Sequence, residues 1–211
     1  MTDAWRCFVA VPLPERLRTA LSVSVGAWRE EAGAPALRWT APDGWHVTLA
    51  FLGATDPTLV PALAEALRAA LPGWPAWTAH AGGLGAFPRA ARARVLWYRV
   101  EDPSGALGAL ASAVRDALQP MAPSLREAQS FRAHVTLARA RDPGGTDLRA
   151  WLEERPAPAA ALPVDRVILF RSHLGAGPAR YEALETVPLA GGNGGMIGGV
   201  AESGAEVSVD G

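Results

Sequence analysis

The sequence predicts an α+β fold with antiparallel sheets, arranged as two similar lobes. Short apolar runs typical of strands alternate with stretches of helical periodicity, and several strands follow one another as hairpin neighbours. The order of these signals begins again near residue 102, which indicates two related halves. No glycine-rich dinucleotide fingerprint follows the first strand, so a parallel doubly wound sheet is not expected. With 211 residues, 49% of them hydrophobic, the chain can bury one core.

The elements at the start of the chain follow from local signals. The apolar run 7–11 is typical of a strand, and a proline then opens a helix over 15–30, because proline is favoured at the first helical position. Strands over 37–40 and 45–52 are joined by the turn signal Pro-Asp-Gly at 42–44.

The rest of the first half contains one helix and two strands. Asp56 is expected to cap a helix that begins at Pro57, because leucines recur through this stretch at helical spacing. Strands over 77–81 and 94–100 complete the half.

The second half repeats this order of elements. Asp102, followed by a proline, again predicts the capped start of a helix with a buried apolar stripe. A strand over 131–138 and a short helix over 146–154 come next, and the chain closes with strands over 164–172 and 181–187. Each half therefore combines a sheet with helices that cover it.

The end of the chain differs in composition from the rest. Residues 191–211 contain eight of the 22 glycines, three acidic residues and no arginine. This composition is typical of a flexible tail. We therefore expect one folded domain over 1–190, followed by a tail that the domain does not need.

Charge and cysteine content limit the classes of function. All 20 basic residues are arginine and the formal net charge is -1, which gives no overall field to hold a long nucleic acid non-specifically. Without residues 191–211 the charge becomes about +2, a sign that suits a phosphate ligand. Cys7 is the single cysteine, and no apolar segment is long enough for a signal-peptide core or a membrane span. We expect a cytoplasmic monomer without a membrane partner.

The strongest motif is a repeated pentapeptide. Residues 46–50 and 134–138 both read HVTLA, and each copy falls within a predicted strand. Because side chains alternate across a sheet, each His and Thr pair shares one face while the Val and Leu share the other. If the two lobes face each other, two imidazoles and two hydroxyls meet in one cleft.

Two histidines and two threonines suit acid and base chemistry on a phosphate ester. Imidazole has an ordinary pKa near 6.5, so one ring can accept a proton while the other donates one at the same pH. The threonine hydroxyls can donate hydrogen bonds to the non-bridging phosphate oxygens. A cyclic phosphodiester carries a single negative charge, so this chemistry implies no metal and no other cofactor.

These residues resemble the 2H phosphoesterases, and in particular the RNA 2',3'-cyclic phosphodiesterases, also called 2'-5' RNA ligases. The resemblance extends over about 5–190 and includes RCFVAVPLPERLRTAL, RWTAPDGWHVTLAFLG, ARVLWYRV, FRAHVTLARA and VILFRSHLG with YEAL. It implies a bilobal fold with the active site in the cleft between the lobes. It also implies hydrolysis of RNA ends or 2',3'-cyclic nucleotides to the 2'-phosphomonoester, with 2'-5' ligation as the reverse reaction.

The resemblance also implies a role for each residue of the two motifs. His46 would be the proton donor and His134 the proton acceptor, while Thr48 and Thr136 would bind the substrate. The spacing alone cannot make this assignment of the two histidines, because the motifs are locally identical.

Two alternatives remain open from the residues alone. A nucleotide- or RNA-binding module of the same fold could keep the cleft without turnover, although both motifs are intact. Histidines that bind a metal would need further ligands, but there is no His-x-x-x-His, no Cys pair and no carboxylate at ligand spacing from either motif.

Several arginines have roles that the sequence leaves open. Arg139 could reach a phosphate, but strict alternation places it on the core face unless the strand twists or bulges. The roles of Arg89, Arg92 and Arg94 are open as well, because arginine is the only cation of this chain. Trp45, next to His46, is expected to point away from the catalytic face.

Overall fold

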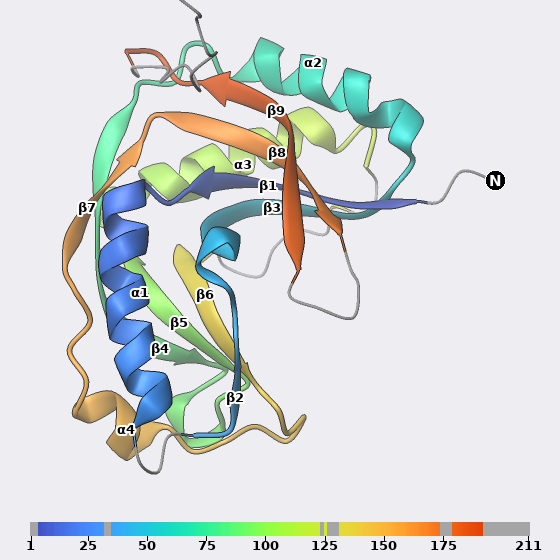
Figure 1. Ribbon diagram of the computed structural model, residues 1–211. Helices are drawn as coiled ribbons and strands as arrows, with labels where there is room; N and C mark the ends of the chain where they lie inside the picture. Colours follow the sequence, from blue (N-terminus) through green and yellow to red (C-terminus); the bar gives the residue numbers. More distant parts are fainter. Residues whose placement is uncertain (1–3, 32–34, 123–124, 126–130, 174–178, 192–211) are drawn as a thin grey trace, which may run out of the picture.

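The computed structural model describes residues 4–31, 35–122, 125, 131–173 and 179–191, and it confirms an α+β fold with a curled antiparallel sheet (Figure 1). The strands within these residues are β1 (Trp5–Pro12), β2 (Leu37–Trp39), β3 (His46–Thr55), β4 (Trp77–Phe87), β5 (Val95–Glu101), β6 (His134–Ala140), β7 (Ala160–Val164), β8 (Arg166–His173) and β9 (Arg180–Pro188). The helices are α1 (Glu15–Glu30), α2 (Val60–Ala70), α3 (Ala106–Leu118) and α4 (Arg149–Glu153), with 3-10 turns η1 (Pro42–Gly44), η2 (Pro57–Leu59) and η3 (Ala90–Arg92).

The strands form one path whose two halves have matching order. The path runs β7-β4-β5-β6-β3-β1-β8-β9, and β2 pairs with β6 beside it. β3 and β6 are joined at a single pair of residues, Val47 and Val135, so the two halves meet along a narrow seam. Each half contains one HVTLA segment at this seam, which is the pseudo-symmetry that the repeat indicates.

The two halves are interleaved along the chain, rather than consecutive as the succession of sequence signals suggests. β8 returns to pair with β1, so the last two strands belong to the same half as the first. The helices cross over as well. α1 follows β1 but contacts β7 of the other half, and α3 follows β5 but packs against β3. Each half therefore buries its sheet with a helix from the other.

Most predicted elements agree with the structure, and α1 has the predicted bounds. Strand β7 was not predicted, since it is short and contains Pro163; it lies at the end of the sheet path, where proline is tolerated. The helix expected after Asp102 begins only at Ala106, because Gly105 has a left-handed backbone with φ of 72°. The Asp102 carboxylate still caps the helix and accepts hydrogen bonds from the N–H groups of Leu107 and Gly108, both at 3.0 Å.

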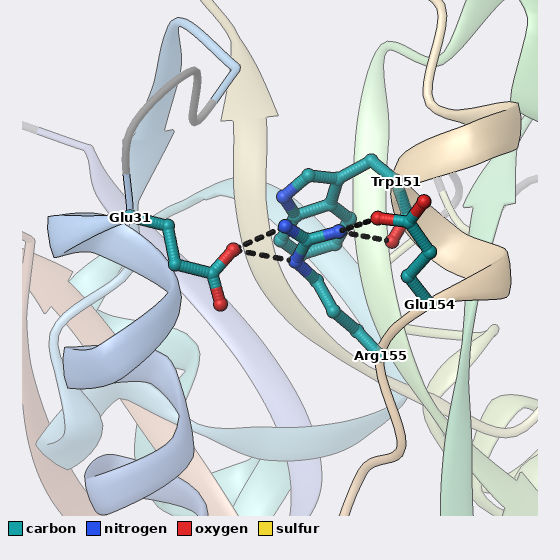
Figure 2. A network of polar contacts seen from close by, with 4 residues as sticks. All are labelled: Glu31, Trp151, Glu154 and Arg155. Carbon is teal, nitrogen blue, oxygen red and sulfur yellow. Dashed lines mark hydrogen bonds and ion pairs between the residues drawn. The ribbon is translucent and has the colours of Figure 1, made fainter.

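A half-buried arginine that follows α4 connects it to the end of α1. The Arg155 guanidinium donates two hydrogen bonds to the Glu31 carboxylate and one, at 3.0 Å, to the backbone carbonyl of Trp151 (Figure 2). Its carbon also lies 4.7 Å from the centre of the Trp151 ring. This cluster fastens the helix that crosses from one half to the other.

The described chain ends at Gly191. Leu189 is buried and Ala190 exchanges backbone hydrogen bonds with the segment Trp74–Ala76, so the fold continues to this point. Apart from Gly191, the expected tail over 191–211 lies outside the described residues. Among the helices that the structure describes, none has the length and apolarity needed to cross a membrane.

Candidate active site

The seam between the halves brings the two HVTLA segments together. β3 and β6 pair antiparallel with Val47 opposite Val135. In an antiparallel pair this register sets His46 opposite Thr136, and Thr48 opposite His134, on the face away from the buried valines. Both histidines and both threonines are half-buried, while the valines are fully buried. The four predicted site residues thus occupy one patch of the sheet.

The two histidines are held by equivalent hydrogen bonds. Both residues begin their strands, whereas the sequence suggested positions inside them. His46 Nδ1 lies 2.8 Å from the carbonyl oxygen of Gly44, and His134 Nδ1 lies 2.7 Å from that of Arg132. A carbonyl only accepts, so each Nδ1 carries the proton and donates it. The Nε2 atom of each neutral ring is therefore left as a proton acceptor.

Aromatic rings surround His46. Its ring stacks on Phe8 with centroids 4.6 Å apart and meets the edge of Tyr181 at 5.3 Å. Burial among these rings lowers the pKa of His46 to about 4, although the hydrogen bond to Gly44 opposes this decrease. A positive charge on His134 lowers the pKa of His46 further.

Gly44 has little space for a side chain beside this ring. A Cβ at position 44 would lie 3.1 Å from the Tyr181 ring and 3.2 Å from Thr40 Cγ2. The close approach allows the Gly44 carbonyl to hold His46 while Tyr181 packs against it.

His134 also lies beside aromatic rings, and two arginines act on it. Phe87 and Trp97 lie beside its ring, with centroid distances of 4.9 and 6.1 Å. Burial lowers the pKa of His134, and the charges of Arg139 and Arg132 lower it further, while the hydrogen bond to Arg132 opposes them. Both histidines are therefore biased towards the neutral form before an anion binds.

Matching β-bulges change which side chains face the site. Leu49 on β3 and Leu137 on β6 have no opposite residue in the register with β1 and β5. An extra residue in a strand shifts the alternation that follows it. Phe51 and Arg139, each five residues after a histidine, consequently return to the face of the histidines. The sequence alone did not decide whether Arg139 faces the core or the site. The bulge turns Arg139 towards the site.

A cavity of about 530 Å³ lies over this patch. His46 and Thr136 line this cavity, whereas Thr48 and His134 do not. The cavity therefore borders only two of the four predicted site residues. The other lining residues that matter for recognition are basic or aromatic: Arg6, Arg38, Arg139, Phe8, Phe51 and Tyr181. Such a volume is in the range of small-molecule sites.

Sequence reasoning missed Arg38, Phe51 and Tyr181. Arg38 and Tyr181 come from β2 and β9, whose register against the central strands is set by long-range pairing. Phe51 had a local signal, because two successive apolar residues, Leu49 and Ala50, follow Thr48 and interrupt the alternation.

The other arginines and Trp45 lie elsewhere. Arg89, Arg92 and Arg94 are exposed and do not line the cavity, and Arg92 Nε donates a 2.8 Å hydrogen bond to the carbonyl of Gly144. Trp45 is buried, as expected for a residue pointing away from the site.

No group of three or more His, Cys, Asp and Glu side chains suitable for a metal ion occurs in the described part of the chain. The site side chains are instead imidazoles, hydroxyls and guanidinium groups. This set of groups handles protons and binds phosphate oxygens without supplying carboxylate or thiolate ligands.

Comparisons with known proteins identify the superfamily to which this chain belongs. The sequence profile of the 2'-5' RNA ligase superfamily matches residues 14–176. The chain belongs to this superfamily, which confirms the resemblance to the 2H phosphoesterases. An RNA 2',3'-cyclic phosphodiesterase of Geobacillus stearothermophilus is 29% identical over 191 residues, which cover 90% of this chain and 59% of that protein. The chain thus spans about three fifths of that relative.

Other relatives match over nearly their full length. The RNA 2',3'-cyclic phosphodiesterase of Methanothermobacter thermautotrophicus is 28% identical over 186 residues, covering 87% of this chain and 98% of the relative. Among solved structures, TT0787 of Thermus thermophilus aligns with a TM-score of 0.69 and 26% identity, over 87% of this chain and 97% of that one. E. coli LigT complexed with 3'-AMP has the same fold, with a TM-score of 0.69 and 24% identity over 89% of this chain and 99% of that one.

Proposed function

We propose that the protein is a metal-independent RNA 2',3'-cyclic phosphodiesterase, which opens the cyclic phosphate of an RNA end or a nucleotide to the 2'-phosphomonoester. The observation that carries the proposal is the Val47–Val135 pairing, which makes the two HVTLA segments neighbours and sets both histidines on one face of the sheet. The names of the relatives from Geobacillus and Methanothermobacter support this choice of substrate.

In the proposed reaction, His134 is the base and His46 the acid. Nε2 of His134 takes a proton from a water molecule, whose oxygen attacks phosphorus while the bond from phosphorus to O3' breaks. Nε2 of His46 gives a proton to the departing O3'. Each transfer contributes about 10²- to 10⁴-fold to the rate. A 5'-hydroxyl in place of water would form a 2'-5' linkage by the same steps.

The anionic substrate favours the protonated form of His46 that the reaction needs, and the proton itself comes from the solvent. Burial disfavours the charged ring in the free protein, but a phosphate beside it favours the imidazolium. We propose that the hydroxyls of Thr48 and Thr136 donate to the non-bridging oxygens, and that Arg139 pairs with them. Phe51, 63% exposed and lining the cavity, offers a face on which a base can stack.

We further propose that the folded domain acts as a cytoplasmic monomer. Its single cysteine is Cys7, which is buried, and burial raises the pKa of the thiol. This residue supplies no disulfide that an oxidising compartment would require.

The test is turnover of adenosine 2',3'-cyclic phosphate by the purified protein in excess EDTA. We expect full activity with chelator and a loss of at least about 10²-fold in kcat for His46→Ala and for His134→Ala. Phosphorus NMR is expected to show a 2'-phosphate product. Circular dichroism of both variants checks that they fold.

Three outcomes would contradict parts of the proposal. Full turnover in either variant would exclude the acid and base pair, and loss of activity in EDTA would exclude a metal-independent reaction. Binding of the nucleotide without any turnover in the wild-type protein would favour a binding module instead.

A further inference from the structure

Two arginines lie directly opposite each other beside the site. β2 pairs antiparallel with β6, and the register places Arg38 across from Arg139. Both side chains are exposed and both line the cavity that contains His46. Opposite residues on neighbouring strands share a face, with Cα atoms about 4.5–5.5 Å apart. The two guanidinium groups therefore project into the same region.

Two positive charges opposite each other are unfavourable unless an anion lies between them. Like charges directly opposite on a sheet destabilise it. Among the described residues, six arginines form ion pairs with carboxylates, but no carboxylate lies within 4.0 Å of Arg38 or Arg139. Within the described residues, as for most arginines of the chain, no carboxylate balances these two charges; what distinguishes the pair is that the two arginines are opposite each other and both line the cavity.

The two arginines have different relations to the histidines. Arg139 follows His134 on the same strand and lines the cavity together with Thr136, and its charge lowers the pKa of both His134 and Tyr181. Arg38 lies on β2, which pairs with residues 138–140 of β6. β3 pairs with the same strand nearer its start, at Val135. The backbone N–H of Thr40, two residues later, donates a 2.8 Å hydrogen bond to the carbonyl of Leu137, the bulged residue before Arg139. This bond fixes β2 against the bulge.

We propose that Arg38 binds a second phosphate group of the substrate, next to the cyclic phosphate that Arg139 binds. This proposal rests on the proposed function. A substrate that carries a second phosphate is an RNA chain, whose terminal nucleoside bears a 5'-phosphodiester, rather than a mononucleotide cyclic phosphate. A guanidinium group suits a phosphodiester because two of its N–H groups can donate to the two non-bridging oxygens at once. Arg38 is thus a specificity residue for RNA ends.

The test compares substrates with and without a second phosphate. These are adenosine 2',3'-cyclic phosphate, the same nucleotide with a 5'-phosphate, and the dinucleotide ApA with a terminal 2',3'-cyclic phosphate. For the wild-type protein we expect kcat/KM to be about tenfold higher with the second phosphate, which corresponds to about 1.4 kcal/mol. Arg38→Ala is expected to reduce this ratio to about one, and Arg38→Lys to restore part of it.

The control is Arg16→Ala, since Arg16 is an exposed residue of α1 outside the cavity; its ratio should equal the wild-type ratio. A preference for the 5'-phosphate but not for the dinucleotide would overturn the RNA assignment in favour of a free nucleotide phosphate. An unchanged ratio in Arg38→Ala would overturn the role of Arg38. No hydrolysis of any of the three substrates would instead refute the proposed function.

A second measurement does not depend on turnover. The dissociation constant of adenosine 3',5'-bisphosphate, measured by calorimetry at several salt concentrations, should depend on salt more steeply in the wild-type protein than in Arg38→Ala. Equal slopes in the two proteins would also overturn the proposal.

Discussion

Each of the two site histidines has one nitrogen fixed by the backbone and one nitrogen free for chemistry. Nδ1 of His46 and of His134 donates to the carbonyl two residues earlier, so the ring orientation does not depend on a carboxylate partner. Burial then lowers the pKa of both rings. The free protein is therefore poor in imidazolium, and protonation is coupled to the arrival of an anion.

This coupling predicts how stability depends on pH. In the unfolded chain His46 has a pKa near 6.5, while in the folded protein its pKa is about 4. Between these values the unfolded state binds more protons, so the free energy of unfolding falls as pH decreases from about 6.5 to about 4. The His46 contribution to this loss is about 3 kcal/mol.

Urea unfolding of the wild-type protein and of His46→Gln over this pH range measures that contribution. We expect the variant to lose less stability than the wild-type protein as the solution is acidified. Parallel curves for the two proteins would show that His46 is not buried in its neutral form.

Among single residues, the repeat made it possible to predict from the sequence that His46, His134 and the two threonines lie together. The alternation of a strand explains why each His and Thr pair shares a face, and the structure places all four on one patch. Arg38 and Tyr181 could not be predicted in this way. Their positions depend on which strands pair, and that pairing is set by contacts between distant parts of the chain.

At the scale of elements, the bulges explain both what the sequence predicted and what it left open. Strict alternation would have turned Arg139 towards the core, but Leu137 is an extra residue and reverses the faces after it. Leu49 does the same before Phe51. The two bulges therefore turn the Arg139 cation of β6 and the Phe51 ring of β3 towards the site. The two identical motifs are thus followed by chemically different side chains.

The contact between α1 and α4 predicts a measurable loss of stability. Arg155→Ala removes hydrogen bonds to Glu31 and to the Trp151 carbonyl, together with the contact with the Trp151 ring. The Arg155 side chain is only 16% exposed. We expect the free energy of unfolding in urea to decrease by about 1–2 kcal/mol.

Arg149→Ala, at the start of α4, is the control. Arg149 pairs with Asp147, but its side chain is 67% exposed, so the change should cost clearly less stability than Arg155→Ala. An equal effect of the two substitutions would show that the Arg155 cluster does not fasten the helices.

At the scale of the whole molecule, the fold closes at the end of the described chain. Leu189 is 2% exposed, and Ala190 N–H donates a 2.7 Å hydrogen bond to the carbonyl of Trp74. We propose that the folded domain needs nothing beyond this point. A chain that ends at Gly191 should keep the melting temperature and the kcat/KM of the full chain.

A chain that ends at Val187 is the comparison. It lacks the buried Leu189 and the bond to Trp74, so its melting temperature should be lower by about 5–10 °C. Equal melting temperatures for the two truncated chains would contradict this account, as would destabilisation of the chain that ends at Gly191.

Because α1 and α3 each pack on the half of the sheet that they do not follow in the chain, the protein cannot easily be divided into two folded fragments. A cut between β5 and α3 leaves a first fragment whose β1 and β3 have lost their covering helix, and a second fragment whose β8 has lost its pairing strand β1. Neither piece could shield its own apolar surface from water. Co-expressed as separate polypeptides, the two should be recovered together as a heterodimer or not at all.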